Sequence, residues 1–447
     1  MKQNRPYPIL SVSRKAERSV LAGHPWIYDA EIRQINGTPL PRAKGGHSSP
    51  SDDPQSDDPQ SAAVPDASSL WPANGSIVDV VTEGGKYLGT GFLSLHSKIR
   101  VRLISRNAND RFDAAFWERR IRYAWEYRKT VMGPDIGCCR LIFGEADQFP
   151  GLTVDRFEDI VVTQTLSYGM ELLKPVIFPL IVKVLAEDGI LLRGIYERDD
   201  VSIRDREGLA QHKGWFPLTD KDGRPLPQPD SCLTEIRENG VYYEVDVENG
   251  QKTGFFLDQK YNRQAVARLA AGKRVLDCFT HTGSFALNAA RGGAAHVCAV
   301  DISQTAVDMA RKNALRNHLE DRMSFMTANV FDLLPALEQE HGEKYDFIIL
   351  DPPAFTKSRR TVDNARKGYK EINLRAMKLL PRGGYLATCS CSHFMPDDLF
   401  IRMLQSAARD AGVTLKQIEA RQQAPDHPIL WSVPETDYLK FYIFQVI

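Results

Sequence analysis

The chain has 447 residues, of which 26% are charged and 43% hydrophobic, and its formal net charge is zero. This length is typical of two or three domains, and the composition excludes a disordered or fibrous protein. Zero net charge excludes a basic field over the whole molecule, so a polyanion would have to meet a local basic patch. We find no uncharged apolar run long enough to cross a bilayer and no signal-peptide core, and therefore expect no membrane partner.

The seven cysteines have the spacing of free thiols. They include the neighbours Cys138 and Cys139 and the pair Cys389 and Cys391, and none matches the C-x-x-C pairs of a zinc site. Thiols without that pattern are typical of a reducing compartment. We therefore expect a cytoplasmic protein that holds no metal.

Residues 1–105 are predicted to form a small β-rich domain. Short strands are indicated at 8–12, 23–28, 76–81, 87–93 and 98–104. Strands of this length separated by turns with glycine favour a small barrel. A short helix or turn between the first two strands carries the basic residues Arg14, Lys15 and Arg18, close in sequence to Trp26.

Within this domain, residues 36–74 form a segment of low complexity. It contains the tandem repeat SDDPQ at 51–55 and 56–60 and few apolar residues. Too little apolar surface is available to offset the entropy lost on ordering, so we predict a disordered surface insertion.

Residues 106–229 are predicted to form a central α+β domain. Apolar residues at helical spacing indicate an amphipathic helix over 112–131 with a basic face. Further elements are a strand, turn and strand over 140–156, a strand at 160–166, a helix at 172–185 and a strand at 194–198. The stretch 217–229, rich in Pro, Asp and Lys, is typical of a domain boundary.

Residues 230–447 alternate strands and helices, which predicts an α/β domain with a mostly parallel sheet. Strands are indicated at 275–277, 297–300, 323–326, 345–351, 384–389 and 438–444. Sheets of this kind bind their ligands at the carboxyl ends of the strands.

The first two strands of this domain end in acids, Asp277 and Asp301, and a loop with Gly283 leads from the first strand into a helix. This pattern is typical of a nucleoside site, where the second acid accepts hydrogen bonds from ribose hydroxyls. The loop lacks the G-x-G-x-x-G of dinucleotide folds, which favours a cofactor without phosphates. The alternative is an ordinary βαβ unit whose acids only cap helices.

Two later strand ends carry reactive side chains. Asp351 opens the loop DPPAF (351–355), whose two prolines make it stiff enough to hold a carboxylate and an aromatic ring against a planar base. The next strand ends in TCSCS (388–392), where Cys389 and Cys391 are two residues apart and can face the same side. Both thiols could simply be buried, but a thiol beside a positioned acid is also what covalent catalysis requires.

These motifs resemble the RlmI/RlmO-type bacterial 23S rRNA (cytosine-5)-methyltransferases. The resemblance rests on GHPWI (23–27), GEADQFPGL (144–152), ENGQKTGFFLDQKYNR (248–263), DPPAFTKS (351–358), KGYKEIN (367–373), TCSCS (388–392), DHP (426–428) and PE-x-x-YLK (434–440). It covers essentially the whole chain except 36–74.

The resemblance implies an N-terminal RNA-binding PUA domain, a central α+β domain and a Rossmann-like methyltransferase domain that binds S-adenosylmethionine. It implies that the partner is 23S rRNA or a large-subunit precursor. A homodimer is a possibility that neither the sequence nor the resemblance decides.

The resemblance also implies roles for individual residues. Those expected to border S-adenosylmethionine are Lys252, Thr253, Phe255, Gln259, Asp277, Phe279, Thr280, Gly283, Asp301, Asn329 and Asp351. Among them Asp277 and Phe279 would lie near the methionine, Asp301 near the ribose and Asn329 near the adenine. Residues expected to hold RNA are Arg14, Lys15, Arg18, Trp26, Pro352, Pro353, Phe355 and Lys357.

The implied reaction methylates carbon 5 of a cytosine. A thiolate adds to carbon 6, carbon 5 takes the methyl group, and loss of the carbon-5 proton and of the thiol restores the ring. Counted from Gly383 and Gly384, the position of the nucleophile falls on Cys391, and Cys389 is the second choice. Asp351 would contact the ring and assist proton transfer. The base must be unstacked, which favours an RNA loop or an incompletely assembled particle as substrate.

Two other functions stay open from the residues alone. In an amino-group methyltransferase acting on adenine or guanine, the loop that begins at Asp351 would polarise the exocyclic amine and the cysteines would be structural. An RNA-binding assembly factor would keep the cofactor pocket without the chemistry.

Overall fold

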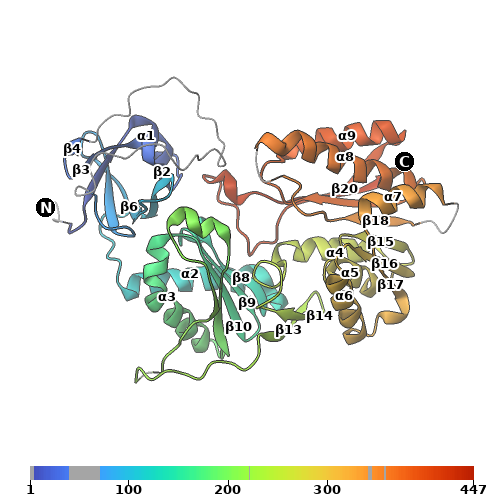
Figure 1. Cartoon of the computed structure of the whole chain (residues 1–447), viewed down its shortest axis with the longest axis horizontal. Helices are drawn as coiled ribbons and strands as arrows, with labels where there is room; N and C mark the ends of the chain where they lie inside the picture. The colour runs from blue at the N-terminus through green and yellow to red at the C-terminus, as the bar shows by residue number, and fades with distance from the viewer. Residues whose placement is uncertain (1–4, 40–70, 221, 341–344, 357–358) are drawn as a thin grey trace.

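The computed structural model describes residues 5–39, 71–220, 222–340, 345–356 and 359–447. Three parts follow one another along the chain, with the N-terminal part at the left of Figure 1, the central part below it and the C-terminal part at the right. Most of the predicted insertion at 36–74 and the predicted site residue Lys357 lie outside the described residues.

The N-terminal part is a seven-stranded sheet in the order β2-β7-β6-β5-β1-β3-β4. Its elements are β1 (Ile9–Val12), α1 (Arg14–Leu21), β2 (Trp26–Tyr28), β3 (Ile32–Ile35), β4 (Thr38–Pro39), β5 (Ile77–Thr82), β6 (Tyr87–Leu93) and β7 (Ile99–Ser105). The hydroxyl of Ser13 accepts a hydrogen bond from the N–H of Ala16 and so caps α1. The predicted small β-rich domain is confirmed, and β3 and β4 are additional strands.

The central part is a five-stranded sheet in the order β12-β11-β10-β9-β8 with two long helices. Its elements are α2 (Ala114–Met132), β8 (Cys138–Phe143), β9 (Leu152–Phe157), β10 (Ile160–Thr165), α3 (Tyr168–Glu187), β11 (Gly194–Asp199) and β12 (His212–Trp215). The predicted basic face of α2 includes Arg128, but this side chain is buried: it binds Asp147 through two hydrogen bonds and donates to the carbonyl of Asp426.

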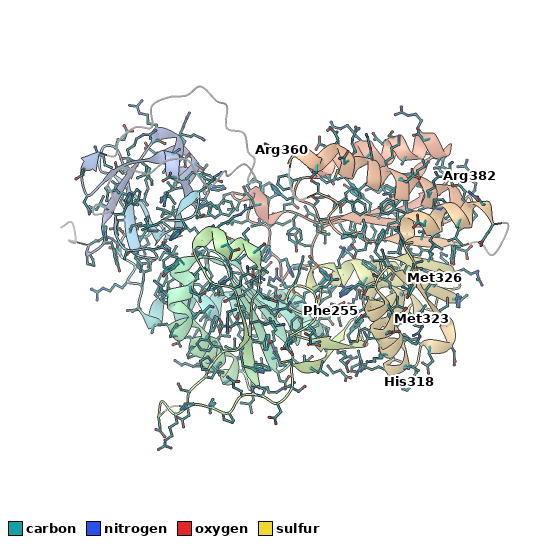
Figure 2. All side chains as sticks on the ribbon, in the orientation of Figure 1. Phe255, His318, Met323, Met326, Arg360 and Arg382 are labelled. Carbon is teal, nitrogen blue, oxygen red and sulfur yellow. The ribbon has the colours of Figure 1, made fainter. Side chains whose placement is uncertain are left out.

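A hairpin, β13 (Leu233–Glu238) and β14 (Val241–Asp246), joins the central and C-terminal parts. Its residues Ile236 and Tyr243 belong to an apolar cluster that also contains Phe157 of the central sheet and Val275 of the C-terminal sheet. Figure 2 shows Phe255 at this junction. The two parts therefore share a core, and the predicted boundary at 229/230 stays a prediction, as does the one at 105/106.

The C-terminal part is a seven-stranded sheet in the order β17-β16-β15-β18-β19-β21-β20. Its strands are β15 (Arg274–Cys278), β16 (His296–Asp301), β17 (Met323–Thr327), β18 (Phe347–Leu350), β19 (Tyr385–Ser390), β20 (Leu415–Arg421) and β21 (Lys440–Val446). Five strands from β17 to β19 are parallel, β21 runs antiparallel to β19, and β20 pairs antiparallel with β21. The predicted α/β class and mostly parallel sheet are confirmed.

Helices cover both faces of this sheet (Figure 1). They are α4 (Lys260–Leu269), α5 (Ser284–Arg291) and α6 (Gln304–Arg316) on one face and α7 (Val330–Gln339), α8 (Val362–Leu379) and α9 (Asp397–Ala411) on the other. In the described ranges, each helix is too short or too polar to span a membrane. The parallel strands all end at one edge, where the predicted site residues Asp277, Asp301 and Asp351 lie.

Candidate active site

Asp277 is the second-last residue of β15, and its carboxylate holds the loop that leads from this strand into α5. It accepts hydrogen bonds from the Thr280 hydroxyl at 2.6 Å and from the Ala286 N–H at 2.9 Å. Its second oxygen, Oδ1, is buried and has no hydrogen-bond partner in the described part of the chain. Burial raises the pKa of Asp277 to about 7, and the negative charges of Asp351 and Asp301 act in the same direction.

The loop after β15 is held in an unusual backbone conformation. Phe279, His281 and Gly283 have φ angles of +64°, +52° and +83°. A Cβ atom on Gly283 would lie 2.9 Å from the Cβ of Ala310, so glycine is needed here for space as well as for φ. The close turn brings the start of α5 against the strand ends.

The second acid, Asp301, holds the same loop from the neighbouring strand. Its carboxylate accepts hydrogen bonds from the N–H groups of His281 and Ser303, each at 2.9 Å. Burial lowers the pKa of His281 to about 4. Asn329 has a comparable local task, because its side chain accepts from the N–H of Phe331 and caps α7.

Asp351 follows β18 and lies in a cluster with Gln259 and Cys389. Its Oδ1 accepts a hydrogen bond from the thiol of Cys389 at 2.9 Å and from Nε2 of Gln259 at 3.2 Å. Gln259 comes from the short helix η6 (Leu257–Gln259), and the side chain of Asn262 donates to its oxygen at 2.6 Å. Burial raises the pKa of Asp351.

The two predicted thiols have different surroundings. Cys389 is 1% exposed and belongs to the core of the sheet, and burial raises its pKa well above the usual value. Cys391 comes one residue after β19 ends and is partly exposed. Burial and the charge of Asp351 raise the pKa of Cys391 to about 11, whereas Lys252 lowers it. Both thiols are therefore within electrostatic reach of Asp351, but only Cys391 can be approached from solvent.

The predicted aromatic residues gather beside these acids. The ring of Phe355 lies 4.6 Å from Tyr369, 5.7 Å from Phe331 and 6.5 Å from Phe279, measured between centroids. In the same loop Pro352 is buried and Pro353 is exposed. The stiff loop thus places an aromatic ring between the ends of β15 and β18 and the start of α7.

The predicted cofactor-binding residues between 252 and 259, which precede β15, divide into two groups. Thr253 donates to Asp155 of the central sheet at 2.6 Å, and Phe255 is buried beneath the guanidinium of Arg263 at 4.7 Å. Through these two contacts the segment is anchored to the rest of the protein. Lys252 is exposed, and its charge acts on Cys391, so it belongs with Gln259 on the side of the thiols.

The residues predicted to hold RNA do not form one surface. Arg14, Lys15 and Arg18 are exposed on α1. Trp26 instead donates its indole N–H to Glu145 of the central part at 2.9 Å and lies under Arg102. Its ring is therefore engaged in a contact between two parts of the chain.

Three residues near the thiols were absent from the predicted set. The Tyr438 hydroxyl donates to Asp258 at 2.7 Å, and the second oxygen of Asp258 is buried without a partner in the residues described. The charge of Asp258 raises the pKa of Cys391, so the two groups are neighbours. Lys440 donates to the carbonyls of Ser392 and Tyr438 at 2.7 and 2.8 Å. Asp258 could have been predicted from the sequence, because it is a polar residue directly next to the predicted site residue Gln259.

The charge at the strand ends fits a cationic cofactor. Asp277, Asp301 and Asp351 repel one another, and Asp277 keeps one buried oxygen unpaired. A sulfonium cation among them would relieve that repulsion. Within the described ranges, no group of three or more His, Cys, Asp or Glu side chains is placed to hold a metal ion.

Comparisons with known proteins agree with this geometry. A family of S-adenosylmethionine-dependent methyltransferases matches residues 223–444, and a PUA-like domain family matches 10–47 and 59–106. Ribosomal RNA large subunit methyltransferase I from Salmonella typhimurium and from Salmonella agona are each 36% identical over 444 residues, which is 99% of this chain and 98% of the relative.

Solved structures support the fold over the whole length. A methyltransferase from Streptococcus mutans and a methyltransferase solved in complex with SAH each cover 98% of this chain with 99% of their own, at 20% identity and a TM-score of 0.74. The matching family model and the full-length relatives make S-adenosylmethionine the cofactor. The chain belongs to the ribosomal RNA large subunit methyltransferase I family and combines a PUA-like domain with an S-adenosylmethionine-dependent methyltransferase domain.

Proposed function

We propose that this protein methylates carbon 5 of a cytosine in 23S rRNA, with Cys391 as the covalent nucleophile. The observation that carries the proposal is the partly exposed Cys391 thiol beside Asp351, at the strand ends where the methyltransferase fold binds its cofactor. The names of the full-length relatives support large-subunit rRNA as the substrate class. The exposed basic residues of α1 support an RNA contact in the PUA-like domain.

S-adenosylmethionine supplies the methyl group as an electrophile. In the proposed arrangement its methionine end lies near Asp277 and Phe279, its ribose near Asp301 and its adenine near Asn329. Gln259 orients the Asp351 carboxylate toward the site through the 3.2 Å hydrogen bond. The charge of Lys252 lowers the pKa of Cys391 and so opposes the larger effect of burial.

The protein's own groups then act on the pyrimidine ring. The sulfur of Cys391 forms a bond to carbon 6, which makes carbon 5 nucleophilic enough to accept the methyl group. Asp351, whose pKa is raised by burial, can hold a proton and exchange it with the ring. After methyl transfer the Asp351 carboxylate, which has given its proton to the ring, takes the carbon-5 proton, the bond between sulfur and carbon 6 breaks, and the aromatic ring is restored.

The test is methyl transfer from labelled S-adenosylmethionine to unmodified 23S rRNA, followed by nucleoside analysis. Wild type should form 5-methylcytosine, and Cys391→Ala should form none. A transcript with 5-fluorocytidine should trap a covalent complex with the wild type, because carbon 5 cannot release fluorine as it releases a proton. That complex should be absent with Cys391→Ala and present with Cys389→Ala. A methylated purine, or a product formed by Cys391→Ala, would contradict the covalent mechanism.

A further inference from the structure

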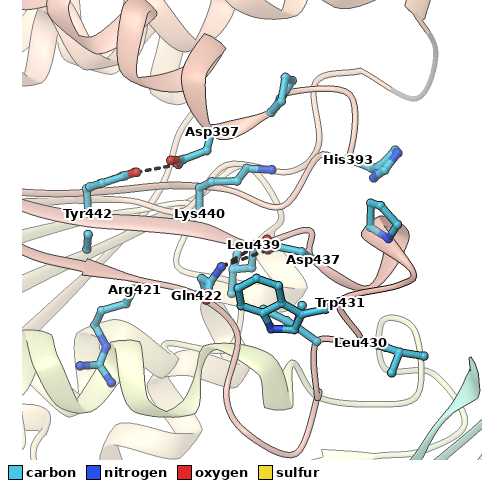
Figure 3. Close-up of a pocket in the computed structure, with 14 residues that line it drawn as sticks. His393, Asp397, Arg421, Gln422, Leu430, Trp431, Asp437, Leu439, Lys440 and Tyr442 are labelled. Atoms are coloured by element: carbon cyan, nitrogen blue, oxygen red, sulfur yellow. Dashed lines mark hydrogen bonds between the residues drawn. The ribbon is translucent and has the colours of Figure 1, made fainter. Parts of the chain in front are cut away.

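A cavity of about 750 Å³ lies next to the loop that carries Cys391 and shares only Lys440 with the candidate active site. Figure 3 shows its lining side chains, which come from the start of α9, from β20 and β21 and from the loop that joins these two strands. This volume is in the range of pockets that enclose a small organic molecule or a single nucleotide.

Trp431 gives the cavity its most unusual feature, because its side chain is 97% exposed. The other side chains of the lining offer hydrogen-bonding groups and charge: Gln422 and Asp437 contact each other at 3.3 Å, and His393 is exposed. An uncovered indole beside an amide and a carboxylate suits a planar base that stacks on the ring and is read at its edge.

The cavity is connected to the proposed nucleophile through Lys440. This lysine lines the cavity and donates to the carbonyl of Ser392, the residue after Cys391. Cys391 itself is not part of the lining. The cavity is therefore beside the thiol rather than around it, so it does not enclose the base that the thiol would attack.

The loop between β20 and β21, which carries Trp431, also contacts the PUA-like domain. His24 lies 3.6 Å from the carboxylate of Glu435, and Gly23 packs against Ser432. These residues directly follow α1, which carries the exposed basic side chains. A strand of RNA that runs from α1 to Cys391 would thus pass over the loop of Trp431.

We propose that this cavity binds the base of a nucleotide that flanks the target cytosine in the RNA strand, stacked on Trp431. The inference rests on the proposed RNA-methylating function and extends it, because it assigns a second base-binding site next to the catalytic one. Stacking holds the strand in register while the target base is unstacked.

The first experiment measures binding of an unmodified 23S rRNA transcript at physiological salt. Trp431→Ala should weaken binding at least about fivefold, and Trp431→Phe should restore most of it because the aromatic face returns. The matched control is Leu191→Ala, which removes a side chain that is 80% exposed in the central part and should leave binding unchanged. Binding of S-adenosylmethionine should be the same in all four proteins. Equal RNA affinity of wild type and Trp431→Ala would overturn the proposal.

A second experiment uses short RNAs centred on the modified nucleotide that nucleoside mapping identifies. An abasic position on one side of that nucleotide should weaken wild-type binding as much as Trp431→Ala does, and the two changes should not add. If Trp431→Ala and an abasic position weaken binding additively, whichever side of the modified nucleotide carries the abasic position, no flanking base is stacked on Trp431. If wild type forms a product other than 5-methylcytosine, the proposed function fails, while the abasic and Trp431 comparison still decides the cavity.

Discussion

The thiol of Cys389 donates a hydrogen bond to Oδ1 of Asp351 at 2.9 Å, which joins the second-last residue of β19 to the residue that follows the neighbouring strand β18. Both lie at the edge of the sheet where the parallel strands end. In the proposed mechanism, this hydrogen bond makes Cys389 the thiol that positions the Asp351 carboxylate and leaves the more exposed Cys391 as the thiol that reacts.

Truncation of Cys389 should therefore reduce activity without abolishing it. Cys389→Ala leaves Oδ1 of Asp351 with only the hydrogen bond from Gln259, and loss of the other one should cost about 1–3 kcal/mol in the free energy of unfolding. We expect roughly a tenfold fall in kcat, because a carboxylate that is less well positioned transfers protons less efficiently. Cys389→Ser, which keeps a donor, should recover much of this loss. Denaturant unfolding and steady-state kinetics measure both effects, and loss of all product in Cys389→Ser would instead make Cys389 the nucleophile.

Removal of the charge at Lys252 should slow the reactions of Cys391. Lys252 lowers the pKa of this thiol, and because the side chain is exposed the effect should be modest. In Lys252→Met a smaller fraction of Cys391 is ionised at mildly alkaline pH, so alkylation by iodoacetamide should be several-fold slower. Lys252→Arg keeps the charge and should behave like wild type. Peptide mapping by mass spectrometry follows Cys391 alone, and equal alkylation rates in Lys252→Met would exclude this electrostatic role.

The affinity for S-adenosylmethionine should increase with pH around neutrality. Burial raises the pKa of Asp277 from its usual value of 3.8 to about 7. The folded protein therefore binds more protons than the unfolded chain between these values, and the stability of the cofactor-free protein should fall as pH rises through that window. A sulfonium cation favours the ionised carboxylate, so cofactor binding should tighten as pH rises through about 7. Calorimetry tests this, and the pH dependence should be absent in Asp277→Asn.

The secondary structure could be predicted where apolar runs are long. The run FIIL lies inside the predicted strand 345–351 and forms β18, and the predicted strand 297–300, VCAV, lies inside β16. β20 was missed because its residues, LKQIEAR, are half-buried or exposed, so the sequence has no clear apolar pattern there. It is held as an edge strand by pairing with β21. Local sequence does not contain that information.

The candidate site was predictable in part for a related reason. Acids at strand ends follow from the βαβ pattern, so Asp277, Asp301 and Asp351 could be located from sequence. The contact between Asp258 and Tyr438 joins residues 180 positions apart and depends on how the C-terminal loop folds back. The burial that separates Cys389 from Cys391 also depends on the complete sheet, since both residues have the same local sequence signal.

A final prediction concerns the contact between the PUA-like domain and the loop that carries Trp431. Gly23 has a φ angle of +111°, and a Cβ atom there would lie 2.5 Å from the Cβ of Ser432. Gly23→Ala should therefore lower the free energy of unfolding through backbone strain and a steric clash. Gly37→Ala is the matched control, because its φ is +82° and nothing lies within 4 Å of the added atom; it should show the strain alone, at about 1–2 kcal/mol.

The clash can be separated from the strain with a double variant. Overpacking of this kind costs about 1–3 kcal/mol beyond the strain. The double variant Gly23→Ala with Ser432→Gly lacks the opposing Cβ and should recover the free energy lost to the clash. Compared with Ser432→Gly alone, it should be less stable only by about as much as Gly37→Ala is less stable than wild type. Urea unfolding of the four variants gives the comparison. If the double variant recovers nothing, the two segments are not in contact in solution, and an RNA path from α1 across this loop to Cys391 loses its structural basis.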